Sequence, residues 1–388
     1  LNEGFIDITD NIYLEEDDHA KNISKELHDK DVLLSVVGSL GETAMFSNYL
    51  TGKTSLPRNI AFIRTNEDKI LPEFLTSFFL SKFSKEQCIY SGGGNIQGLL
   101  SLTKLKKFIV PVPDMQVQES FKEKYTKALD LEFKILSSIE DCKKELYKAL
   151  DINFSKLKFK NSFPASIENI KSNSIWTPSF YDTKPSEILS EIGKKFELKS
   201  LGTLTTIKKG NEIGSENYKD YLLKTDLDVS FIRTSDIYNY QINSYPSYYA
   251  SKDIYYELNQ DFKTGDIILN NDGRIGYVSI ITSEDKAIYQ SHIRRLRTKK
   301  EYKNLQSYIF LCLIINEIGG IQFKKNTVIQ TTIPTLANRV ENIVIPIIND
   351  EAIKIISSKM DLVISMIEEK KRIIKLIKCE MNKLINYS

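Results

Sequence analysis

The chain has 388 residues, of which 41% are apolar, so it is long enough for two or three domains with their own cores. Its 53 Lys and Arg residues nearly balance 51 Asp and Glu, and the net charge of +2 neither favours nor excludes nucleic acid as a ligand. Four widely spaced cysteines and three histidines argue against a disulfide framework and a structural zinc site, so we expect no metal and a reducing, cytoplasmic location. No apolar run is long enough to span a bilayer.

An internal repeat organises the sequence. The stretch KDVLLSVVGSLGETA at 30–44 matches GDIILNNDGRIGYVS at 265–279, with a constant offset that takes Asp31 to Asp266. Downstream, FIVPVP at 108–113 matches IVIPII at 343–348 with the same offset. A register kept over that distance indicates a duplicated unit.

Each copy is predicted to be a β-rich domain of the α+β class. Short apolar runs closed by glycine turns predict buried strands, at 32–37 and 59–64 in the first copy and at 267–270 and 288–297 in the second. Helices are expected at 72–83 and 304–318, and an edge strand at 108–113.

A long helix with a heptad pattern follows each domain. Apolar residues recur in steps of three and four, which predicts a helical seam in each copy. The seams are Phe121, Tyr125, Ala128, Ile135, Ile139, Cys142, Leu146 and Ala149, and then Ile356, Met360, Val363, Ile374, Ile377, Met381 and Leu384. One charge interrupts each seam, Glu132 in the first and Lys370 in the second, which favours two helices packing as an antiparallel coiled coil. The alternative is that each helix packs only on its own domain.

These features divide the chain into five predicted parts. They are a first β-rich domain (1–115), a first long helix (116–155), a linker rich in Ser, Lys and Pro (156–195), a second β-rich domain (196–349) and a second long helix (350–388). The second copy carries an additional segment, 196–233, whose counterpart would precede Leu1. We therefore expect the first domain to be N-terminally truncated.

The order of these parts resembles the DNA specificity subunits of Type I restriction-modification systems, and the related target-recognition regions of fused adenine DNA methyltransferases. The resemblance covers nearly the whole chain. The pieces that carry it are FIRTSDI at 231–237, KTGDIILNNDGRIG at 263–276, VIQTTI at 328–333 and IVIP at 343–346, with SGGGNIQGLLSLTKLKKFIVPVP at 91–113 in the first copy.

The resemblance implies two target-recognition domains that bind double-stranded DNA without acting chemically on it. Adenine DNA methyltransferase subunits would be the partners, with a restriction nuclease or translocase subunit as a further one, and AdoMet is expected only in the methyltransferase. No cofactor is therefore expected in this chain.

Two catalytic motifs were considered, and the sequence supports neither. No two prolines are adjacent, so the Pro-Pro motif of adenine methyltransferases is absent. Pro113-Asp114 followed by Glu132-Phe133-Lys134 satisfies a nuclease pattern literally, but Glu132 interrupts the helical seam and the second copy has no Pro-Asp pair at the matching place. We expect no catalytic residue.

The candidate DNA-binding residues lie in loops and near strand ends. Gly93 and Gly94 next to Asn95 and Gln97 would allow a close approach of the backbone to DNA, and amide side chains can pair with adenine. A flexible surface turn is the alternative there, and a P-loop is disfavoured because Gly98 precedes Leu99 and not Lys. The other candidates are Arg58, Asn59, Lys208, Lys209, Asn211, Arg274, His292, Arg294, Lys324, Lys325, Asn326 and Gln330. Alternation along HIRRLR at 292–297 allows at most one of its faces to read DNA.

Three functional hypotheses follow. The first is a non-catalytic recognition subunit that reads a bipartite target and directs an adenine methyltransferase. The second is the recognition half of a single-chain methyltransferase or restriction-methyltransferase whose catalytic part lies upstream. The third is a coiled-coil interaction protein that does not bind DNA.

Overall fold

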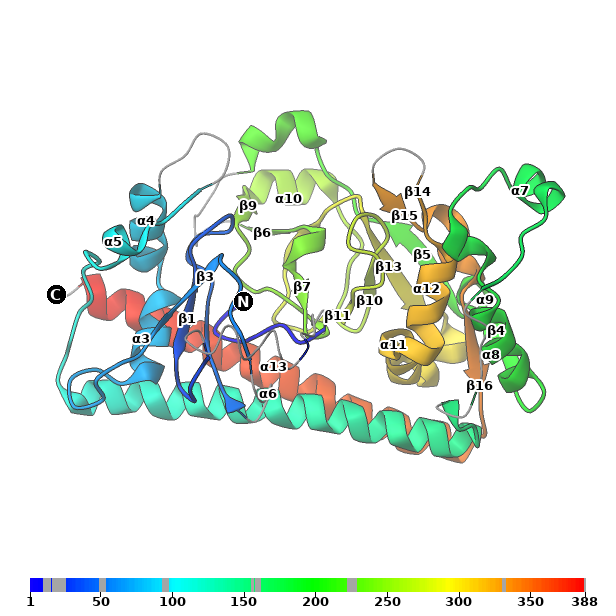
Figure 1. The fold of residues 1–388 in the computed structure, drawn as a ribbon, viewed down its shortest axis with the longest axis horizontal. Helices are drawn as coiled ribbons and strands as arrows, with labels where there is room; N and C mark the ends of the chain where they lie inside the picture. The colour runs from blue at the N-terminus through cyan, green and yellow to red at the C-terminus, as the bar shows by residue number, and fades with distance from the viewer. Residues whose placement is uncertain are drawn as a thin grey trace. The chain divides into compact units, whose positions relative to one another are not determined.

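The computed structural model of the protein describes residues 1–9, 15, 26–48, 54–92, 98–154, 157, 162–221, 229–329 and 333–386 (Figure 1). The chain divides into two compact units. Unit 1 comprises Leu1–Phe133 and Glu369–Ser388, and unit 2 comprises Lys134–Glu368. The two long helices α6 (Met115–Leu150) and α13 (Asp350–Asn386) each contribute to both units.

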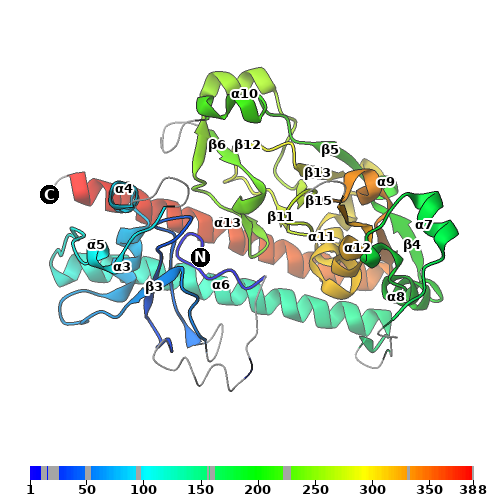
Figure 2. The same cartoon turned by 45° about the horizontal axis from the view of Figure 1, so that its top comes forward.

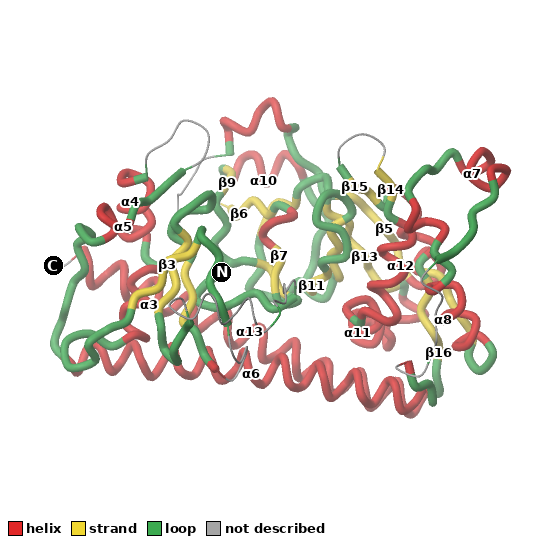
Figure 3. The backbone as a smooth tube through the Cα atoms, in the orientation of Figure 1, coloured by secondary structure: helices red, strands yellow, loops and turns green. Residues whose placement is uncertain are grey.

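Unit 1 is built on a three-stranded antiparallel sheet with β1 (Val32–Ser35) in the middle, shown in yellow in Figure 3. On one side lies β2 (Thr43–Met45) and on the other β3 (Ile60–Ile63). All residues of β1 and β2 are buried, as their apolar character requires. The helices of the unit are α3 (Pro72–Phe79), α4 (Lys82–Ser91) and α5 (Leu102–Leu105).

The long helices pair antiparallel within unit 1 (Figure 2). Lys124 Nζ lies 2.9 Å from Glu380 Oε2, and the ammonium of Lys370 contacts the carboxylate of Glu132. Both members of the second pair are buried. The two charges that interrupt the predicted seams therefore face each other, which is consistent with the antiparallel packing expected from the sequence.

Unit 2 contains a four-stranded sheet in the order β11 (Val278–Ile280), β10 (Ile267–Asn270), β13 (Ile293–Thr298) and β5 (Thr205–Lys209). Apolar clusters cover both faces of this sheet. Ile267 and Leu269 belong to the large core, whereas Ile268 belongs to a second cluster on the other face. Because both faces are covered, the sheet offers only its ends and loops to a ligand.

The remaining strands of unit 2 form small sheets. β12 (Ala287–Tyr289), β6 (Val229–Ile232) and β9 (Tyr248–Ala250) make one, and β16 (Val344–Ile347) pairs with β4 (Glu197–Ser200). Two further pairs join β7 (Ile237–Tyr238) to β8 (Gln241–Ile242) and β14 (Val328–Ile329) to β15 (Pro334–Thr335). The α-helices of unit 2 outside the long pair are α7 (Ile167–Asn173), α8 (Lys184–Gly193), α9 (Leu201–Leu204), α10 (Lys252–Leu258), α11 (Gln306–Ile314) and α12 (Ile321–Asn326).

Three sequence predictions need correction. The strand expected at 288–297 is two strands in different sheets, because a turn in which Ile293 N donates to Gln290 O separates β12 from β13. Residues 108–113 form no strand, since no strand pairs with them in the described part of unit 1. Part of the expected linker at 156–195 belongs to a core: α8 buries Ile188 and Ile192 in unit 2.

The long helices also pair within unit 2. Glu145 Oε1 accepts a hydrogen bond of 3.1 Å from Lys359 Nζ. The apolar seam residues of this part are buried in the large core, namely Ile135, Ile139, Cys142, Leu146, Ile356, Met360 and Val363.

No single helix in the described ranges is long and apolar enough to cross a membrane, although the pair Lys300–Ile314 and Asn316–Asn326, bent by 74°, meets the length and composition criteria together.

The internal repeat is also present in three dimensions. The offset that takes Asp31 to Asp266 relates β1 to β10, β2 to β11 and α6 to α13. The third strand departs from it: Ile60 lies opposite Ser35, and Ile293 lies opposite Asn270, so β3 and β13 are related by a slightly smaller offset. The repeat is therefore structural, with a shorter connection before the third strand in unit 2.

One ion pair is repeated at the end of the third strand. Arg64 Nη2 lies 2.7 Å from Asp31 Oδ2 in unit 1, and Arg297 Nη2 lies 2.7 Å from Asp266 Oδ2 in unit 2. The contact with Asp266 raises the pKa of Arg297 above its ordinary value. Each pair anchors the third strand to the residue that precedes the first.

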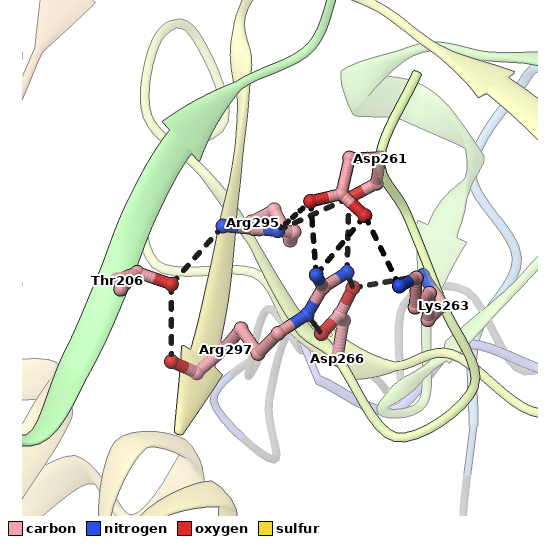
Figure 4. Close-up of polar contacts among 6 residues, drawn as sticks. All are labelled: Thr206, Asp261, Lys263, Asp266, Arg295 and Arg297. Carbon is pink, nitrogen blue, oxygen red and sulfur yellow. Dashed lines mark hydrogen bonds and ion pairs between the residues drawn. The ribbon is translucent and has the colours of Figure 1, made fainter. Parts of the chain in front are cut away.

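Unit 2 enlarges this pair into a network (Figure 4). Asp261 accepts from both Arg295 and Arg297, and Arg295 also donates to Thr206 Oγ1 at 3.1 Å. The side chain of Arg295 is fully buried, and burial lowers its pKa. Arg295 and Arg297 therefore hold β5, β13 and the loop before β10 together, and we exclude both from the DNA interface.

Two glycines of the β10–β11 turn provide a matched pair of variants that tests how tightly this turn is packed. Gly273 and Gly276 both have positive φ, +74° and +84°, but a Cβ at Gly273 would meet nothing within 4 Å, whereas one at Gly276 would lie 3.0 Å from Phe323 Cδ2. Gly273→Ala should cost about 1 kcal/mol from backbone strain alone. Gly276→Ala should cost about 1 to 3 kcal/mol more through overpacking. Urea unfolding of the two variants measures the difference, and equal costs would contradict the packing described.

Candidate nucleic-acid interface

Basic side chains gather where the strands of the unit 2 sheet end. Arg294 lies opposite both Leu269 and Lys209, and His292 O accepts from Asn271 N, so the ends of β5 and β10 meet the start of β13. The turn Asn271–Gly276 follows β10, and Gly276 packs against Phe323 of α12. We call the exposed and half-buried basic side chains here the strand-end surface: Lys208, Lys209, Arg274, His292, Arg294 and Lys324.

His292 is oriented by an acid. Its Nδ1 lies 2.7 Å from Asp272 Oδ2, and Asp272 also accepts from Asn271 Nδ2 at 3.0 Å and from the hydroxyl of Thr335. The side chain of His292 is 46% exposed. Because Asp272 holds Nδ1, the other ring nitrogen is the one that can contact a base edge or a phosphate.

The cations of the surface fall into two kinds. Lys208, Lys209 and Lys324 are exposed, as phosphate contacts require. Arg294 is half-buried, burial lowers its pKa, and its Nη1 donates to Ser291 O at 2.8 Å. Arg274 lies over the ring of Tyr277, with Cζ 3.9 Å from the centroid. The two arginines are thus held in place, which suits the reading of base edges.

Three predicted residues are engaged inside unit 2. Asn211 Nδ2 donates to Leu258 O at 3.1 Å, and Asn326 Nδ2 donates to Gln322 O at 2.9 Å. Lys325 contacts the hydroxyl of Ser186, and burial lowers its pKa. Asn211, Lys325 and Asn326 are therefore not part of the strand-end surface.

Unit 1 has an equivalent position with different side chains. Asn59 O accepts from Val36 N at 2.9 Å, as His292 O accepts from Asn271 N at 2.9 Å, so Asn59 stands in the place of His292. Arg58 and Asn59 are both exposed. Where unit 2 has Arg274 between two glycines, unit 1 has Ser39.

The remaining predicted residues lie outside the described residues: Gly93, Gly94, Asn95, Gln97 and Gln330. The structure does describe residues that follow them in the chain. Gly38 N donates to Gly98 O at 3.1 Å, and Gly273 N donates to Pro334 O at 2.9 Å. In both units the chain therefore lies beside the glycine turn at Gly98 and at Pro334.

Sequence reasoning missed Asp272, which orients His292. The only sequence feature at Asp272 is the Asp-Gly dipeptide of the turn. That dipeptide predicts a bend in the chain, but it does not predict that Asp272 contacts His292. The corresponding residue of unit 1 is Val37, so no carboxylate occupies that position there. Among the described residues, no group of three or more His, Cys, Asp and Glu side chains could hold a metal ion.

The sequence matches the family described as "Type I restriction modification DNA specificity domain" over residues 5–141 and 193–378. The chain therefore belongs to this family, whose members determine the DNA sequence on which a Type I restriction-modification system acts. It is a DNA sequence-specificity protein with two copies of the specificity domain. No curated protein matches it.

Solved structures of related subunits are similar to this chain at low identity. The HsdS subunit from Thermoanaerobacter tengcongensis is 14% identical, with 93% of this chain and 80% of that chain covered and a TM-score of 0.33. The Type I restriction-modification S subunit from M. genitalium is 12% identical, with 92% and 82% covered and a TM-score of 0.35.

Proposed function

We propose that this chain reads a bipartite DNA target and directs an adenine DNA methyltransferase to it, together with a nuclease subunit in systems that carry one. The observation that carries the proposal is the duplicated strand-end geometry. Both units have a glycine turn after the first strand, Gly38–Gly41 and Gly273–Gly276, beside the start of a third strand. Each unit would place its own side chains on its own half of the target.

The two half-sites should differ in sequence. Unit 2 offers His292, Arg274 and Arg294 at its strand ends, and Arg is the side chain that most often reads guanine. Unit 1 offers Asn59 in the place of His292, and an amide pairs best with adenine. Different donors and acceptors at equivalent positions favour different bases.

The exposed lysines have a separate role in this proposal. Lys208, Lys209 and Lys324 would neutralise phosphates, which contributes affinity and register but no sequence information. Methyl transfer would take place in the partner, which would also hold AdoMet. The chain itself would supply recognition and no chemistry.

Methylation mapping tests this proposal. We expect the genome of cells that carry this chain and its methyltransferase partner to show N6-methyladenine in a motif of two short base sets separated by a free spacer. Long-read sequencing reads the motif directly. A continuous motif would mean that only one unit reads DNA, and a genome without methylation that depends on this chain would overturn the proposal.

A further inference from the structure

The turn between β12 and β13 carries the side chains that we propose for base reading in unit 2. Ile293 N donates to Gln290 O at 2.9 Å, which closes the turn. His292 lies inside it. Arg294 follows it and donates from Nη1 to Ser291 O at 2.8 Å. The positions of both reading side chains, His292 and Arg294, therefore depend on the backbone at Ser291.

A carboxylate holds this turn. Glu212 Oε1 accepts from Ser291 N at 3.2 Å and from Ser291 Oγ at 2.7 Å. The other oxygen, Oε2, accepts from the hydroxyl of Tyr218 at 2.8 Å. Gln290 Nε2 donates to the same hydroxyl at 2.9 Å. Two consecutive residues of the turn are thus attached to one acid, by charge-assisted hydrogen bonds in the case of Ser291.

Tyr218, which lies in the 3-10 helix η4 (Ser215–Asp220), fixes the acid from the other side. Burial raises the pKa of Tyr218 to about 12; the hydrogen bond from Gln290 opposes this shift, and the one to Glu212 adds to it. The hydroxyl therefore stays protonated at neutral pH and donates to Glu212. The ring of Tyr218 packs edge to face on Phe231 of β6, with the centroids 5.5 Å apart. Glu212 is thus connected to the core through Tyr218.

The backbone that carries Glu212 is also fixed against the turn. Gly210 N donates to Ile293 O at 3.0 Å, and a Cβ at Gly210 would lie only 2.2 Å from Tyr289 O. Glycine is the residue that allows such a close approach of two backbones. Two residues further on, Glu212 therefore stands at a set distance from Ser291 and cannot leave it without moving the end of β5.

An acid at this place opposes the binding of phosphates. Glu212 follows the cations Lys208 and Lys209 within a few residues, and a carboxylate beside them lowers the local positive potential. The other acid of this region, Asp272, holds His292 from the side of the β10–β11 turn. Each acid contacts a different residue of the β12–β13 turn. Their contacts, and not their charge, are what favours base reading here.

We infer that Glu212 is a positioning residue for base reading in unit 2: it holds Ser291 and so fixes the direction of the two reading side chains. The inference rests on the proposed function, because it assumes that His292 and Arg294 read DNA. Discrimination between bases requires donors held in a set geometry at the base edges, and residues behind the reading side chains supply that geometry. Glu212 itself would not touch the target.

Two substitutions at this position separate geometry from charge. Glu212→Ala removes the acceptor of Ser291, so discrimination between the target duplex and one altered in the half-site of unit 2 should fall on the order of 10-fold. Affinity for random duplexes should rise about 2-fold at 50 mM salt, since a carboxylate is lost. Glu212→Gln loses the same charge but keeps an oxygen that can accept from Ser291, so it should gain the same affinity and keep the discrimination.

Competition titrations of the complete chain measure these effects, with the target duplex from methylation mapping and duplexes altered in one half-site at a time. Hydrogen exchange at residues 290–293 should be faster in Glu212→Ala than in Glu212→Gln. The matched control is Glu301→Ala, an exposed acid in the 3-10 helix Lys300–Leu305 that follows β13, which should leave discrimination unchanged. Discrimination at the half-site of unit 1 should persist in all three variants.

The inference is overturned if Glu212→Ala still discriminates at the half-site of unit 2, if Glu212→Gln loses as much discrimination as Glu212→Ala, or if Glu212→Ala loses discrimination at both half-sites. Failure of the proposed function gives a different result: the unmodified chain would then discriminate at neither half-site, and the inference would fall with it.

Discussion

Lys370→Met should lower the free energy of unfolding by roughly 3 kcal/mol or more, because it removes the ammonium group that contacts the buried carboxylate of Glu132. The side chains of Lys370 and Glu132 are 2% and 1% exposed. Burial lowers the pKa of Lys370, and the attraction of Glu132 opposes that shift. Urea unfolding followed by circular dichroism measures the change.

The matched controls separate burial from charge. Changing both residues to Met removes the uncompensated charge, so the double variant should regain most of the stability that Lys370→Met loses. Lys127→Met breaks the exposed pair with Glu369 in the same helix pairing and should cost less than about 1 kcal/mol. If Lys370→Met and Lys127→Met were equally mild, the two long helices would not pair as described.

Neutralising the strand-end lysines should weaken DNA binding strongly. The triple variant Lys208→Ala, Lys209→Ala, Lys324→Ala removes three exposed cations, so affinity for any duplex should fall on the order of 100-fold at 50 mM salt. The slope of log affinity against log salt should decrease by about 2.7, since each lost phosphate contact contributes about 0.9. Titration of random and target duplexes at several salt concentrations measures both.

The control for this variant carries the same change in charge elsewhere. Lys144, Lys148 and Lys354 are exposed in unit 2 on the long helices α6 and α13, and none of them belongs to the strand-end surface. Their replacement with Ala should change affinity less than about 3-fold, through the long-range field alone. Equal losses for the two triple variants would show that net charge, and not the strand-end surface, governs binding.

The repeat made much of the fold predictable. Short apolar runs closed by glycines predicted β1 and β10, and the interrupted seams predicted two helices facing each other antiparallel, which is consistent with the observed contact between Glu132 and Lys370. The strand expected at 108–113 was wrong because strand pairing depends on a partner, which the sequence of the strand itself does not contain. The apolar residues of 108–113 alone could not show whether a partner strand lies beside them.

The site was less predictable than the fold. Lys208, Lys209 and Lys324 were proposed from short basic stretches expected in loops, and the structure instead places them, exposed, in β5 and α12. Asn211 and Lys325 look equally available there, but they contact Leu258 and Ser186, which are far away along the chain. In the sequence, Arg295 cannot be distinguished from its neighbour Arg294. Only its contact with Asp261 in the structure shows that Arg295 is part of the core.

We propose that each unit reads its own half of the target. Methylation mapping with two reciprocal variants tests it: His292→Ala with Arg294→Ala in unit 2, and Arg58→Ala with Asn59→Ala in unit 1. We predict that each variant relaxes the base preference of one half-site, a different half for each, and leaves the other half intact. Loss of both half-sites in either variant, or an unchanged motif in both, would contradict the account.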